Sequence, residues 1–191
     1  MPAMPAVPLQ SPRPWVAEDL DDIPDDGYRR EVIDGVLIVS PAPNLRHQIC
    51  VVDLIVRLAA GAPDELAVVV SPYDWRPPTR ESFQPDVVVI RRADGDPNGP
   101  LRATPLLVVE VLSPSSVQYD KAVKRAAYER LGAHAYWIVD PTSPAITVLR
   151  LNDRGRYREV ARALGDQPLT VDFPFPLQLV PAHLLRKAET V

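Results

Sequence analysis

Two acidic residues in this sequence stand where a charge is costly. Asp86 directly precedes the apolar run at residues 87–90, and Glu110 lies inside the otherwise apolar run at residues 106–112. An ionised carboxylate in such surroundings must be paired, hydrogen-bonded or bound to a metal, since otherwise it takes up a proton or destabilises the fold. Oxygen ligands suit a hard, octahedral cation such as Mg²⁺ or Mn²⁺, which uses only one or two protein carboxylates. Asp86 and Glu110 are therefore candidate metal ligands.

A lysine on the following segment could complete this chemistry. Residues 118–131 form the clearest predicted helix, on which Asp120, Lys124 and Tyr128 share one face at i, i+4 and i+8. In phosphodiester hydrolysis, a metal polarises the phosphate and generates hydroxide, while a nearby ammonium positions the nucleophile and offsets developing charge. Two carboxylates and one lysine are enough for that reaction.

Strands and helices that alternate along the chain must position these residues. The runs at 87–90 and 106–112 are continuously apolar, as expected of strands buried on both faces at the centre of a sheet. Asn44 can cap a helix that extends to about residue 60, and Gly132 ends the second helix. The sequence predicts further strands at residues 66–70, 135–139, 146–151 and 157–160, with 73–75 as an extension or a short neighbour. We therefore expect an α/β fold.

The N-terminal part has a hairpin pattern. Two β-rich runs, residues 28–33 and 36–40, flank Asp34-Gly35, a dipeptide typical of a tight hairpin turn. Proline-rich residues 1–14 are expected to be a flexible tail, followed by a short helix at 15–20. Residues 15–191 are expected to form a single domain, with a last helix near 182–188.

Composition narrows the classes of function. The chain is 46% hydrophobic and 24% charged, which indicates a globular protein despite 23 prolines. The net charge of -4 argues against a protein that coats nucleic acid, although six acids within residues 18–26 carry it and the remainder is +2. Cys50 is the only cysteine, which excludes an intramolecular disulfide and a cysteine-based zinc site. No apolar run suits a signal peptide or a membrane span, so we expect a cytoplasmic protein.

Several segments, taken in order, resemble the Uma-type restriction-endonuclease family of the PD-(D/E)xK nuclease superfamily, across roughly residues 28–151. The resemblance implies a restriction-endonuclease-like mixed β-sheet core flanked by helices, and Mg²⁺-dependent (or Mn²⁺-dependent) cleavage of DNA with Asp86 and Glu110 as ligands. A homodimer is expected, because cutting both strands of DNA often requires two active sites. The segments that carry the resemblance are YRREVIDG (28–35), SP (40–41) with His47, QPDVVV (84–89), VEVLSPSS (109–116), residues 120–128 and YWIVDP (136–141).

The sequence departs from the superfamily pattern at one position. Leu112 stands where the lysine of E-x-K is usual. The Uma-type branch implies a lysine that has migrated to the following helix, and Lys124 matches it better than Lys121. Glu31 and His47 match further polar positions of the branch, where they could complete the metal shell or relay protons.

Each candidate also has a purely structural interpretation. Asp86 could accept a backbone hydrogen bond where a strand begins, and Glu110 could face solvent from a half-exposed strand. Lys124 could be a solvated lysine, Glu31 a cross-strand partner for an arginine, and His47 a surface residue. A module that keeps the nuclease fold and binds nucleic acid or a protein partner without catalysis is the alternative to an enzyme.

Overall fold

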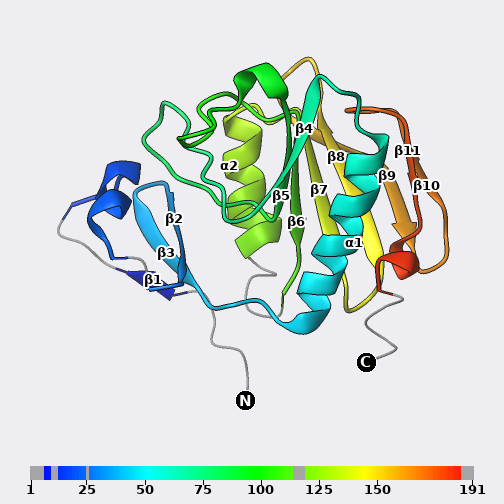
Figure 1. The fold of residues 1–191 in the computed structure, drawn as a ribbon, viewed down its shortest axis with the longest axis horizontal. Coiled ribbons are helices and arrows are strands. Elements are labelled where there is room, and N and C mark those ends of the chain that lie inside the picture. Colours follow the sequence, from blue (N-terminus) through cyan, green and yellow to red (C-terminus); the bar gives the residue numbers. More distant parts are fainter. Residues whose placement is uncertain (1–6, 10–12, 25, 114–118, 186–191) are drawn as a thin grey trace.

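The computed structural model describes residues 7–9, 13–24, 26–113 and 119–185. Its centre is a six-stranded mixed sheet in the order β4-β5-β6-β7-β8-β9 (Figure 1). Neighbouring strands are antiparallel except β6 and β7, which are parallel. The strands are β4 (Leu66–Val70), β5 (Val87–Arg91), β6 (Leu107–Val111), β7 (Ala135–Asp140), β8 (Ala145–Leu151) and β9 (Tyr157–Leu164). The predicted mixed sheet is confirmed.

The two central strands are buried on both faces, as their sequences predict. All five residues of β6 are buried, and so are the first four of β5. Alternate residues face opposite sides of the sheet. Val87 and Val89 belong to the hydrophobic cluster that contains Cys50 and Leu54 of α1 (Leu45–Gly61), whereas Val88 packs with Tyr128 of α2 (Arg125–Arg130). The two helices therefore cover opposite faces.

Local sequence signals fix both helices. The side chain of Asn44 accepts a hydrogen bond from the backbone N–H of His47 and caps α1, as predicted. The predicted second helix is wound in two ways, because Tyr119–Lys124 is π-helical and only Arg125–Arg130 is α-helical. Residue 118 lies outside the described residues. Short π-helical segments are frequent at functional sites, and this π-helical segment ends at Lys124.

A second, three-stranded sheet packs on the α2 side of the central sheet (Figure 1). The predicted hairpin is confirmed as β2 (Arg29–Ile33) and β3 (Val36–Ser40). The two strands are joined by Asp34, with a φ of 50°, and Gly35, with a φ of 75°. Positive φ at both positions is what a two-residue hairpin turn requires. The hairpin is tied to the central body by Arg130 of α2, which contacts both Asp34 and Glu81.

Some expectations from sequence were wrong. Within the expected flexible tail, β1 (Val7–Leu9) pairs antiparallel with β3, because the hairpin leaves the outer edge of β3 available for pairing. Residues 73–75 form no strand; Trp75 makes only isolated bridges to Phe83 and Leu101. A small antiparallel pair, β10 (Leu169–Val171) and β11 (Leu177–Leu179), was not predicted.

The C-terminal part differs from the expected helix as well. The structure has a short 3-10 helix at Pro181–Leu185, and residues 186–188 of the expected helix lie outside the described residues. Over the described part of the chain, no helix has both the length and the apolar character needed to cross a membrane. The short helix at 15–20 is a 3-10 helix at Ala17–Asp22.

Candidate active site

Asp86 lies directly before β5 and is 4% exposed. Its Oδ1 accepts a hydrogen bond from Arg29 Nη1 at 2.9 Å, and its Oδ2 accepts one from the backbone N–H of Val111 at 2.8 Å. His47 Nε2 lies 3.1 Å from the same Oδ2. Burial alone would raise the pKa of Asp86, but the hydrogen bond from His47 and the charge of Arg29 outweigh it and lower the pKa to about 2. Asp86 is therefore an anion at neutral pH.

Glu110 lies in β6 and is 1% exposed. Its Oε1 accepts hydrogen bonds from Lys124 Nζ at 2.9 Å and from the hydroxyl of Tyr128 at 2.7 Å. Burial and the neighbouring charge of Glu110 raise the pKa of Tyr128 well above its ordinary value, so the hydroxyl remains a donor. Because Glu110 is buried, its interpretation as a half-exposed strand residue is excluded.

Glu31 in β2 belongs to the same buried cluster. Its Oε1 accepts the backbone N–H of Gln84 at 2.9 Å, and its Oε2 lies 2.9 Å from Lys124 Nζ. Lys124 is 1% exposed and sits between the two glutamates. A lysine buried this deeply requires carboxylate partners. The interpretation of Lys124 as a solvated surface residue is therefore wrong.

The five candidates occupy one end of the central sheet. The antiparallel register that pairs Val87 with Val109 brings Asp86 opposite Glu110 one step further along. Lys124 is close enough to Asp86 for its charge to lower the pKa of that carboxyl. The structure therefore gathers Asp86, Glu110, Lys124, Glu31 and His47, which come from five separate parts of the chain. The side chains of Asp120 and Lys121 lie outside those that the structure describes.

Two contributors were not chosen as site residues from the sequence. Arg29 is two residues before Glu31 in β2, so the two-residue strand period places both on one face. Tyr128 is one helical turn beyond Lys124, and its place on that face was recognised without a role. Strand and helix spacing could have identified both residues, whereas the backbone N–H of Val111 required the tertiary structure.

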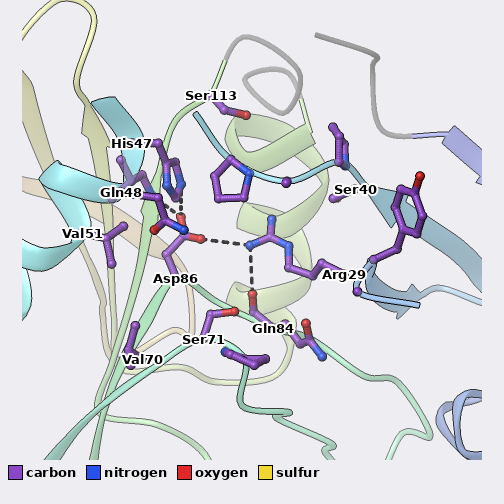
Figure 2. Close-up of a pocket in the computed structure, with 17 residues that line it drawn as sticks. Arg29, Ser40, His47, Gln48, Val51, Val70, Ser71, Gln84, Asp86 and Ser113 are labelled. Carbon is purple, nitrogen blue, oxygen red and sulfur yellow. Dashed lines mark hydrogen bonds and ion pairs between the residues drawn. The ribbon is translucent and has the colours of Figure 1, made fainter. Parts of the chain in front are cut away.

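A pocket with a volume of about 490 Å³ opens beside Asp86. Figure 2 shows His47 and Gln48 of α1 on one side of Asp86 and Arg29 of β2 on the other. Hydroxyl groups of Ser40, Ser71 and Ser113 and several prolines also line it. Asp86 is among the lining residues, whereas the buried residues Glu31, Glu110 and Lys124 are not.

The donor set can be compared with what a metal ion needs. Among the described residues, no three His, Cys, Asp or Glu side chains gather closely enough to hold a metal. Zinc, which normally takes three or four such ligands, does not fit. Mg²⁺ retains several waters and takes one or two carboxylates, which two opposed carboxylates at one sheet end provide. The residues therefore fit a Mg²⁺-type ion.

Comparison with known proteins agrees with this fold. Residues 17–182 match the sequence model of the Uma2 family, described as "Putative restriction endonuclease". The search of curated proteins found no match. Among solved structures, the chain is similar to "a putative nuclease belonging to DUF820" from Anabaena variabilis, with a TM-score of 0.71 and 20% identity over 90% of this chain and 98% of that one.

Proposed function

Because the chain belongs to the Uma2 family, we propose that it is a divalent-metal-dependent endonuclease that hydrolyses DNA phosphodiester bonds. The observation that carries the proposal is the opposition of Asp86 and Glu110 across β5 and β6, with Lys124 at 2.9 Å from Glu110. Asp86 and Glu110 would hold Mg²⁺ or Mn²⁺. The ion would polarise the phosphate and lower the pKa of a water molecule.

The chain's own residues would divide the remaining work. Lys124, which contacts the proposed metal ligand Glu110, would orient the attacking water and offset charge that develops on the phosphate oxygens. Glu31, which shares Lys124 with Glu110, would hold the ammonium in place. His47 and Arg29 would keep Asp86 ionised and oriented. The P–O ester bond would break as the water oxygen bonds to phosphorus; the water would lose a proton to solvent, and the departing oxygen would take one up from solvent.

The test is cleavage of supercoiled DNA and of single-stranded DNA with Mg²⁺, Mn²⁺ or chelator. We expect metal-dependent nicking by the native chain and a loss of at least about 100-fold in Asp86→Asn, Glu110→Gln and Lys124→Met, since each removes electrostatic stabilisation of the transition state. Glu65→Gln, which removes an exposed carboxylate next to β4, is the matched control and should retain activity. Melting temperatures of all variants separate lost chemistry from lost folding. Nicking that persists in chelator would contradict the proposal.

A second candidate is a nuclease fold without turnover, which binds nucleic acid or a protein partner. The observation that favours it is that basic side chains already contact both carboxylates: Arg29 and His47 at Asp86, and Lys124 at Glu110. Calorimetric titration with Mn²⁺ distinguishes the two. Metal binding without cleavage of any DNA supports the binding module.

We also propose that the protein acts as a homodimer, because a single active site cuts one strand at a time. Light scattering coupled to size exclusion measures the mass directly. A mass of one chain at the concentrations used for cleavage would contradict this arrangement.

A further inference from the structure

The pocket beside Asp86 is a concavity with little positive charge among the described residues that line it. Its volume of about 490 Å³ lies in the range of roughly 300–1,000 Å³ that is typical of small-molecule sites. Among the described residues that line it, Arg29 is the only lysine or arginine. Proteins that follow a duplex backbone neutralise many phosphates. The described lining offers a single such cation, so other contacts are expected to supply most of the affinity.

The rim of the pocket carries an aromatic ring. Tyr28 lines the pocket directly before β2, and it is 56% exposed although it is a large side chain. The Asp26 carboxylate accepts the backbone N–H of Tyr28 at 3.1 Å, and Gly27 has a φ of 80 that lets the chain turn at this point. This turn holds Tyr28 at the rim. Exposed aromatic rings beside a polar cavity are typical stacking platforms for bases.

A side chain with hydrogen-bonding groups also lines the pocket. Gln48 on the first turns of α1 is exposed, lines the pocket and has both a donor and an acceptor, which together suit a base edge. Pro41, Pro72 and Val51 supply apolar surface in the same lining. Arg29 and Asp86 also line the pocket, joined by an ion pair (Figure 2). A base that stacks on Tyr28 in this pocket would therefore have its attached phosphate on the side of Arg29, the next residue in the chain, which pairs with Asp86.

From this arrangement we infer that the pocket binds one unstacked nucleotide of a single strand, so that the substrate is unpaired nucleic acid and not an intact duplex. The inference rests on the proposed function, because it names the substrate class of the same site. In a duplex the bases are stacked inside the helix and must be extruded before they enter such a pocket. Single-stranded segments present them without that cost.

The test is fluorescence anisotropy of a labelled 12-nucleotide single strand and of the same strand in a duplex, both with chelator so that nothing is cleaved. We expect the single strand to bind at least about 10-fold more tightly. Tyr28→Ala should weaken its binding by about 5- to 100-fold, the range for one stacked base. Tyr28→Phe, which keeps the ring, should bind as the native chain does.

Two further measurements sharpen the result. The described lining holds one arginine, so the slope of the logarithm of the binding constant against log[salt] should be about -0.7, the value for one phosphate of a single strand. A mononucleotide is offered as a competitor, and we expect only weak competition. Competition at the affinity of the full strand would overturn the inference in favour of a free nucleotide as ligand.

The inference and the proposed function fail in different ways. Equal or tighter binding of the duplex, or unchanged binding by a folded Tyr28→Ala, overturns the single-strand inference even if the protein cleaves DNA. Absence of metal-dependent cleavage overturns the nuclease proposal, and the binding preference measured in chelator still stands. Because Tyr28 is more than half exposed, its substitution should leave the melting temperature unchanged.

Discussion

At the scale of single residues, the site is a set of charges that stabilise one another. Lys124 holds Glu31 and Glu110, whose negative charges would otherwise be buried without compensation. Asp86 likewise depends on Arg29 and on the Val111 backbone. Any substitution here changes both folding and chemistry, so conservative variants and matched controls are needed to separate the two effects.

Tyr128 offers the cleanest such comparison. Tyr128→Phe removes a hydroxyl that donates to the Glu110 carboxylate at 2.7 Å, and we expect a loss of about 1.5–3 kcal/mol in the free energy of unfolding. Tyr157 is buried too, but its hydroxyl donates to a neutral acceptor, the Ala133 carbonyl, at 2.8 Å. Tyr157→Phe should therefore cost only about 0.5–1.5 kcal/mol. Urea unfolding measures both, and an equal or reversed order would contradict the assigned role of Tyr128.

At the scale of elements, the Glu81 carboxylate helps to join α2 to the β2–β3 hairpin. Glu81, which is 5% exposed, accepts hydrogen bonds from Arg130 of α2, from the backbone N–H of Asp34 and from Thr79. Burial alone would raise the pKa of Glu81, but these donors, led by Arg130, lower it below its ordinary value. The ionised form therefore stabilises the packing of the hairpin.

The sign of this shift gives a pH dependence. The pKa of Glu81 is lower in the folded protein than in the unfolded chain, where glutamate has a pKa of about 4.3. The ionised Glu81 therefore contributes its full stabilisation above pH of about 4.3. This stabilisation is lost as the pH falls through the pKa of Glu81 in the folded protein. Glu81→Gln should thus cost about 1–2 kcal/mol at pH 7 and progressively less below pH of about 4. Unfolding midpoints between pH 7 and 3 measure this. The control is Asp172→Asn, at a carboxylate that is 91% exposed, and we expect it to leave the free energy of unfolding unchanged. A destabilisation by Glu81→Gln that grows as the pH falls would contradict the mechanism.

Elements with strong local patterns could be predicted from the sequence. The buried strands β5 and β6, the hairpin turn at Asp34-Gly35 and the helix capped by Asn44 follow from side-chain periodicity and turn chemistry. The three-residue strands β1, β10 and β11 could not, because runs of three residues are too short to show an alternating pattern, and β1 also pairs with β3, which is distant in sequence. The site was predictable as a list of charged residues, but the ion pair of Asp86 with Arg29 was not.

At the scale of the whole molecule, the two hydrophobic clusters share the strands of one sheet. Trp137 belongs to the cluster under α1, and Trp75 belongs to the cluster under α2 and the hairpin. Since β5, β6 and β7 contribute to both clusters, neither face can be lost without exposing the other. A single cooperative unit over the described residues is therefore expected.

Tryptophan fluorescence tests this expectation. Trp75→Phe leaves Trp137 to report on the first cluster, and Trp137→Phe leaves Trp75 to report on the second; Trp15→Phe is added to both to remove the third emitter. Each fluorescence curve should coincide with the circular-dichroism curve of the same variant in urea. Separate midpoints within one variant would show that the two faces unfold independently.

The lone thiol of the protein has a practical consequence. Cys50 is 1% exposed within α1, and burial, together with the charges of Asp53, Asp86 and Asp140, raises its pKa to about 12. Thiolate is the reactive form, so alkylating reagents should modify Cys50 only when α1 opens. The rate of alkylation, followed by intact mass, therefore measures the opening of α1 in crude extracts without a label, and a divalent ion that stabilises the folded state should slow it. Alkylation as fast as that of a small free thiol would show that the helix does not shield this side chain.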